Sequence, residues 1–207
     1  MSFLGSSGVL AKVISVAFAV LVALTPMIWW SFLALTDGLT ANPAQFLILS
    51  SGEWALVGLC LVLSSGPFKR WLGVSWLVSH RRMLGLFTFF YACLHVLGWA
   101  FWEQGMVWSG MWSDVLGRRF VTIGALAFVL MLPLALTSTR GWVRRLGQHW
   151  KRLHLLVYPA LGLSIWHFWM VRAGKNDFAD VFVYIAVASV LLVLRLAVHA
   201  KKRKRVG

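Results

Sequence analysis

The amino-acid sequence predicts an all-α integral membrane protein, a single domain of six transmembrane helices over residues 1–207. Three observations support this fold class. The chain is 60% hydrophobic, it is only 13% charged, and apolar runs of membrane-spanning length recur along most of it. Because these runs and their short connections use nearly all of the 207 residues, we expect no separate soluble domain.

The first apolar run covers about residues 9–35. It is longer than the apolar stretch of a secretion signal and shows no small-residue cleavage site, so we interpret it as a retained membrane anchor. Five further runs each approach the roughly 20 apolar residues that a spanning helix needs. They cover about residues 45–66, 83–102, 120–138, 153–171 and 179–199.

Basic residues are distributed unevenly among the segments that join these runs. If the N-terminus is inside, all but four of the 20 Lys and Arg residues lie on the same side of the membrane as the two termini. This is the distribution of cytoplasmic segments, so both termini are predicted to be cytoplasmic. The net charge of +14 then indicates membrane lipid, not nucleic acid, as the partner of these residues. The four exceptions are Arg118, Arg119, Arg172 and Lys175.

Two histidines lie deep within predicted spans, where ionisable residues are costly and suggest a function. His95 is in the third run and His167 is in the fifth, each about 20 Å from the basic inner end of its helix at ~1.5 Å rise per residue. Two imidazoles at one depth on neighbouring helices can ligate haem iron from opposite faces. His95 and His167 are therefore candidate ligands of a haem in the outer half of the membrane.

A second site nearer the inner face is also considered. His154 begins the fifth run at a depth that only His80 shares on the third, although a position among lipid headgroups also explains His80. On a straight helix His154 and His167 point about 140° apart at ~100° per residue, which makes the outer pair the stronger prediction. The neighbouring Arg82 and Arg152 are candidates to bind haem propionates or a flavin phosphate, and lipid phosphates explain these charges equally well.

Two other classes of function compete with a haem protein. A transporter or channel would line a proton or metal path with these histidines, but it would need polar residues along that path, and the predicted spans hold few carboxylates. A structural subunit would simply pack its histidines between helices, and it would purify without colour.

Four segments carry a resemblance to a known family. They cover residues 81–86, which lead to Tyr91 and His95, then 118–124, 133–138, and 145–158, which precede His167. Their sequences are RRMLGL, RRFVTIG, PLALTS and RLGQHWKRLHLLVY. With these segments the chain resembles the MsrQ family, within the ferric-reductase-like transmembrane group.

The resemblance implies an electron-transfer subunit of the bacterial inner membrane. It implies one or two b-type haems, with His95, His154 and His167 as axial ligands of the iron, and FMN as a further cofactor. The implied donor is a cytosolic flavin reductase that uses NAD(P)H. A quinol is the alternative donor, because the chain contains no nucleotide-binding domain of its own. The implied acceptor is a periplasmic molybdopterin enzyme of the MsrP type, which reduces methionine sulfoxide in proteins.

Overall fold

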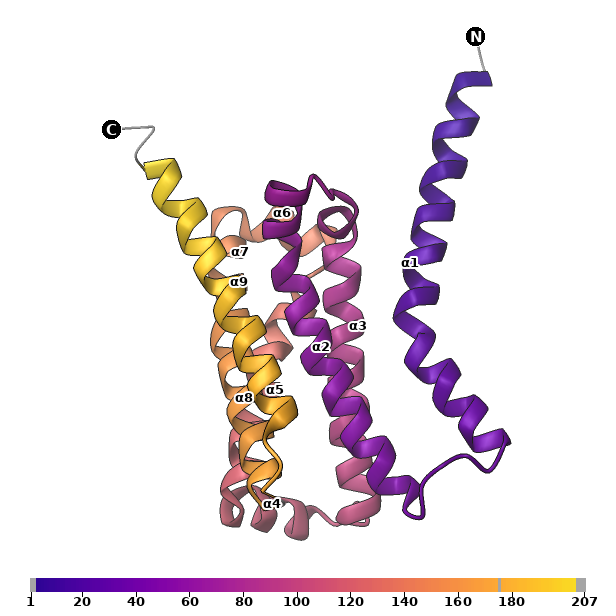
Figure 1. The fold of residues 1–207 in the computed structure, drawn as a ribbon, viewed down its shortest axis with the longest axis vertical. Coiled ribbons are helices and arrows are strands. Elements are labelled where there is room, and N and C mark those ends of the chain that lie inside the picture. The colour runs from indigo at the N-terminus through magenta and orange to yellow at the C-terminus, as the bar shows by residue number, and fades with distance from the viewer. Residues whose placement is uncertain (1–2, 175, 204–207) are drawn as a thin grey trace.

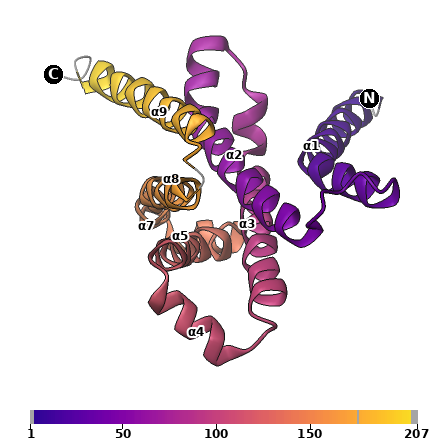
Figure 2. The same cartoon turned by 60° about the horizontal axis from the view of Figure 1, so that its bottom comes forward.

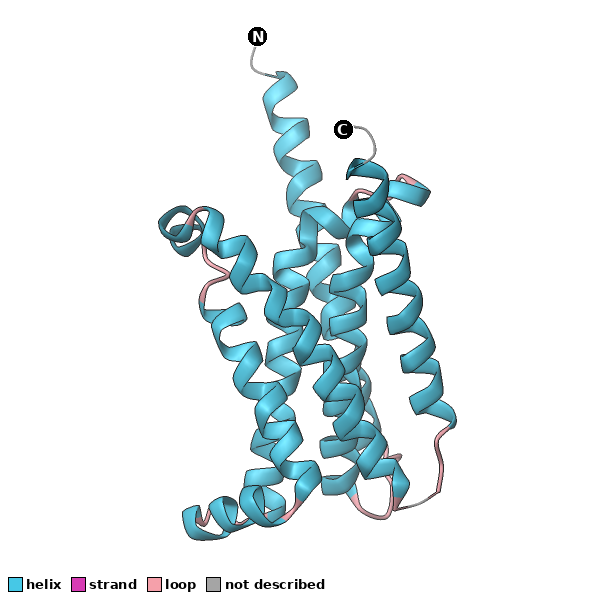
Figure 3. Cartoon of the chain, turned by 90° about the vertical axis from the view of Figure 1, so that its left-hand side faces the viewer, coloured by secondary structure: helices cyan, strands magenta, loops and turns pink. Residues whose placement is uncertain are grey.

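The computed structural model describes residues 3–174 and 176–203, and all regular structure in these residues is helical (Figure 3). Lys175 lies outside the described residues, and so do residues 204–207, the last part of the predicted basic tail. The side chains of residues 3–7 and 198–203 are not described either. In chain order the elements are α1 (Phe3–Leu35), α2 (Pro43–Leu72), α3 (Trp76–Gly98), η1 (Trp99–Glu103), α4 (Trp108–Gly117), α5 (Arg119–Leu136), α6 (Arg140–Leu146), α7 (Gln148–Leu153), η2 (His154–Leu156), α8 (Val157–Ala173) and α9 (Ala179–Arg203).

The described residues contain six helical segments that are long and apolar enough to cross a membrane, which confirms the predicted fold class. An even number of crossings returns the chain to its starting side, and Figure 1 shows both termini at the same end of the bundle. The six segments are Gly8–Leu35, Pro43–Leu72, Trp76–Glu103, Arg119–Leu136, Gln148–Ala173 and Ala179–Ala197.

Several helices extend beyond the predicted apolar runs. α2 continues past residue 66 to Leu72, and α3 begins at Trp76 instead of residue 83. The added turns carry Lys69, Arg70, Arg81 and Arg82. Charged residues lower the local hydropathy, but they do not interrupt backbone hydrogen bonding, so the helix continues where the apolar run stops.

The helices of the bundle pack as two hairpins. α2 packs along α3, α5 packs along α8, and α9 covers α2 and α8 (Figure 1). Buried side chains from both hairpins and from α9 form one apolar core. Its members include Leu56, Leu59, Cys60, Leu63, Tyr91, Ala92, Met131, Ala160, Leu161, Ala188 and Leu191.

α1 lies to one side of the two hairpins and diverges from them toward its N-terminal end (Figures 1 and 2). Its contacts with α3 extend from Trp76, which packs against Phe18, to Tyr91. The hydroxyl of Tyr91 donates a hydrogen bond of 2.7 Å to the carbonyl of Ala23. Trp30 packs edge-on against the same ring, with 5.8 Å between ring centroids. Most other large side chains of α1 are exposed and apolar, as expected for a helix that faces lipid.

Candidate cofactor site between the two hairpins

The fold brings His95 and His167 together. His95 extends from α3 and His167 from α8, and their ring centroids lie 5.9 Å apart with 77° between the ring planes. Each hairpin therefore contributes one imidazole to a shared site.

Each of these imidazoles contacts a backbone carbonyl of the other helix in its hairpin. His95 Nδ1 lies 2.8 Å from the carbonyl oxygen of Ile48 on α2, and His167 Nδ1 lies 2.7 Å from that of Phe120 on α5. A carbonyl oxygen only accepts hydrogen bonds, so the proton of each neutral ring must be on Nδ1. The lone pair of Nε2 is then available to a metal, which is the usual arrangement of ligating histidines.

The two histidines line a cavity of about 410 Å³ between the hairpins. This volume is within the ~300–1,000 Å³ of pockets that enclose cofactor-sized ligands. α2, α3, α5 and α8 all contribute to its walls, which are mainly apolar. Wall residues include Leu56, Leu59, Ala92, Val121, Phe128 and Met131.

Charged residues gather where the cavity reaches the end of the bundle that carries α4. Arg118, Glu103 and Arg172 line this part of the cavity. Arg118 pairs with Glu103 at 3.3 Å and also with Asp114, whereas Arg172 pairs with Asp180 at 2.8 Å. The hydrogen bonds from Arg118 hold the pKa of Asp114 below its usual value, and the same contact raises the pKa of Arg118.

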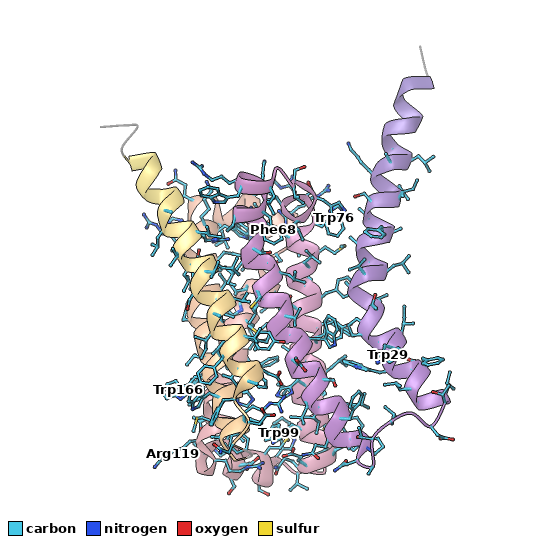
Figure 4. The ribbon with its side chains drawn as sticks, in the orientation of Figure 1. Trp29, Phe68, Trp76, Trp99, Arg119 and Trp166 are labelled. Carbon is cyan, nitrogen blue, oxygen red and sulfur yellow. The ribbon has the colours of Figure 1, made fainter. Side chains whose placement is uncertain are left out.

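Asp114 also ties α4 to the end of α3. Its carboxylate accepts hydrogen bonds from Trp99 Nε1 at 3.0 Å and from Gln104 Nε2 at 2.9 Å. Trp99 begins the π-helical turn η1, a wider turn than an α-helix and one that often marks functional sites. Arg119, which follows Arg118 in the chain, points away from the bundle and is exposed (Figure 4).

His154 and His80 are placed differently from His95 and His167. His154 is not part of the cavity wall, and its ring stacks on Trp150 with 3.8 Å between centroids. His80 is buried, and its Nε2 lies 3.3 Å from Ser15 Oγ on α1. His80 therefore faces α1. Arg82 and Arg152 are exposed at the same end of the bundle as His154.

Sequence reasoning did not single out two glycines that belong to this site. Gly52 on α2 lies against the ring of His95, and Gly124 on α5 lies against the ring of His167. Glycine inside an apolar run carries no local signal of such a contact, because the partner side chain is far away in the sequence.

Comparisons with known proteins place the chain among related sequences. The family model described as "Ferric reductase like transmembrane component" matches residues 49–165. Three relatives share the name "Protein-methionine-sulfoxide reductase heme-binding subunit MsrQ". The protein from Ralstonia nicotianae is 49% identical over 85% of this chain and 82% of its own length. The one from Bordetella pertussis is 46% identical over 87% of each chain.

A more distant relative, from Rhodospirillum rubrum, is 39% identical over 91% of this chain and 90% of its own length. No solved structure matches the chain significantly.

Proposed function

Because the chain belongs to the MsrQ family, within the ferric-reductase-like transmembrane group, we propose that it is a haem-binding electron-transfer subunit of a protein-methionine-sulfoxide reductase system. One observation carries this proposal: His95 and His167 oppose each other across a shared cavity, and both have Nδ1 occupied by a backbone carbonyl. The proposed axial ligands of a b-type haem are these two residues.

The dimensions of the site fit this cofactor. Metal–imidazole bonds of about 2 Å on both sides of an iron leave the ring centres roughly 6 Å apart, close to the spacing of the two histidines. That spacing is 5.9 Å. The apolar walls suit a porphyrin, and Arg118 and Arg172 are placed to pair with propionate carboxylates at the charged end.

When bound, the haem would supply a one-electron carrier, and the chain itself supplies binding and orientation. The carbonyls of Ile48 and Phe120 hold the two rings, while the apolar walls exclude water and so lower the dielectric around the iron. No bond of a substrate has to be broken in this site.

The position of the cavity supports outward electron transfer. Its charged end is at α4, opposite to the two termini (Figure 1). The uneven distribution of basic residues favours cytoplasmic termini, so the cavity would open toward the periplasm of a bacterial inner membrane. The proposed acceptor there is a periplasmic molybdopterin enzyme of the MsrP type.

The opposite end would receive electrons. The proposed donor is a cytosolic flavin reductase that uses NAD(P)H, or a quinol, with FMN as a further cofactor. Arg82 and Arg152 are exposed there and are proposed to bind the FMN phosphate or haem propionates. His154 is the proposed ligand of any second haem, because its Nδ1 lies 3.1 Å from the carbonyl of Trp150 and Nε2 is again the nitrogen left for a metal.

The test is a reduced-minus-oxidised visible spectrum of the detergent-purified chain, with haem per chain quantified as the pyridine complex. A b-type spectrum is expected, and His95→Ala and His167→Ala should each remove the haem of this cavity. His149→Ala is the matched control, since His149 is exposed and outside the cavity. A colourless protein after expression with ample haem would contradict the proposal and favour a transporter or a structural subunit.

A further inference from the structure

The two candidate ligands pack against glycine in the same way. A Cβ atom added at Gly52 would lie 2.8 Å from Nδ1, 3.0 Å from Cε1 and 3.4 Å from Cγ of His95. A Cβ atom at Gly124 would lie 2.9, 3.0 and 3.4 Å from the same three atoms of His167. Separations of this size are shorter than ordinary carbon contacts, so each ring occupies the space of a missing side chain.

The spacing of these contacts along the chain repeats. Ile48 supplies the carbonyl on α2, the glycine follows four residues later, and the histidine follows 47 residues after Ile48. Phe120 on α5 has the same relation to its glycine and its histidine. The two hairpins are therefore two copies of one half-site, each made of a carbonyl, a glycine and an imidazole.

We propose that Gly52 and Gly124 are positioning residues, which let each imidazole lie flat against a helix backbone with Nδ1 on the carbonyl one turn earlier and Nε2 directed to the cofactor. This inference rests on the proposed function, since it concerns the same cavity. It adds two residues that do not touch the iron but decide where its ligands can be.

Each ring would have to move to accommodate a methyl group at its glycine. The hydrogen bond from Nδ1 holds the ring of His95 beside the backbone of α2, and the ring of His167 lies across the cavity. A methyl group at Gly52 would push the imidazole off the carbonyl and toward the cavity. Orienting partners of metal ligands typically affect metal affinity by about 10- to 100-fold, so this displacement should weaken haem binding by a factor of that order.

General helix stability does not explain glycine at these two positions. Alanine is favoured over glycine inside a helix. If these glycines had no role beyond being part of a helix, their replacement by alanine would increase the stability of the chain. Gly66 on α2 and Gly162 on α8 provide matched controls. The nearest atom to a Cβ at Gly66 is Arg195 Nη2 at 3.8 Å, and no atom lies within 4 Å of a Cβ at Gly162.

The first experiment titrates haem into the apo form of the full chain. Gly52→Ala and Gly124→Ala should each bind haem about 10-fold or more weakly, whereas Gly66→Ala and Gly162→Ala should bind it like the unsubstituted chain. Haem that does bind to the first two variants should show a shifted low-spin electron paramagnetic resonance signal, because that signal reports ligand orientation. Wild-type affinity and an unchanged signal in both would overturn the inference.

A second experiment needs no haem and identifies the clash partner. It compares the thermal stability of apo chains carrying Gly52→Ala, His95→Ala or both. Gly52→Ala should destabilise the chain with His95 present and should be neutral or stabilising once the imidazole is gone. Equal effects in the two backgrounds would refute the contact even if Gly52→Ala alone folds poorly.

These outcomes separate the inference from the proposed function. If the unsubstituted chain binds no haem, the proposed function fails, while the stability cycle still tests the contact between Gly52 and His95. If the unsubstituted chain binds haem through His95 and His167 but tolerates alanine at both glycines, only the positioning role is wrong.

Discussion

The imidazole of His154 stacks on the indole of Trp150, one helical turn earlier, with 3.8 Å between ring centroids and 29° between ring planes. This stacking holds His154 in η2, just before α8 and apart from the cavity that His95 and His167 line. The two proposed metal sites are therefore separable by mutation.

The first prediction follows from this separation. His154→Ala should retain the haem between His95 and His167. The haem content per chain should fall only by the amount bound at a second site that uses His154. The pyridine assay and the low-spin resonance signal measure this. If a monodisperse His154→Ala protein lost all its haem, the assignment of the outer pair would be wrong.

The second prediction concerns the carboxylate that ties α4 to the bundle. Asp114→Asn should lower the stability of the chain by roughly 1–2 kcal/mol at neutral pH, because hydrogen bonds from Arg118 to a charged acceptor are lost. Thermal unfolding in detergent measures the difference between the two chains.

The pH dependence of that difference has a defined sign. The pKa of Asp114 is lower in the folded chain than its usual value, so its contribution is fully present above about pH 4, the usual aspartate range. It is lost as the pH falls through the lowered, folded pKa. The stability difference should thus be constant from neutral pH to about pH 5 and should shrink in stronger acid. A difference that already declined between pH 8 and pH 6 would contradict this origin.

The third prediction concerns an arginine within the membrane-spanning part of α9. Arg195 donates hydrogen bonds to the hydroxyl of Tyr158 on α8 and, at 3.2 Å, to the carbonyl of Leu63 on α2. Arg195→Gln should destabilise the chain by about 1–3 kcal/mol, since both contacts link α9 to the hairpins.

Thermal unfolding compares this variant with Arg144→Gln, which changes an exposed arginine of α6 and should have an effect within about 0.5 kcal/mol. Similar losses in the two variants would mean that removal of any positive charge, not the link between helices, accounts for the effect.

The fourth prediction tests the orientation in the membrane. In a chain whose Cys60 and Cys93 are replaced by serine, Ser113→Cys on α4 should react with a membrane-impermeant maleimide added from the periplasmic side. Arg144→Cys on α6 should react only after the inner membrane is opened. Both positions are exposed, so access depends on the side of the membrane. The reverse labelling pattern would place α4 in the cytoplasm.

The sequence by itself was sufficient to predict the six-helix membrane fold and to single out His95 and His167. Lipid requires long apolar runs with internally satisfied backbones, and it makes each ionisable residue within them conspicuous. These signals are local, so they are readable without knowledge of which helices touch. Apolar runs understated the lengths of α2 and α3, because hydropathy decreases at charged turns that remain helical.

Only the tertiary structure decided which groups meet around the two imidazoles. The carbonyl of Ile48 and the missing side chain of Gly52 act on a histidine of another helix, and nothing in their own segment indicates that contact. The contact of His80 with Ser15 likewise depends on where α1 packs against α3. Such contacts arise when separately formed helices pack, because packing, not the local pattern, sets the distance between side chains far apart in the chain.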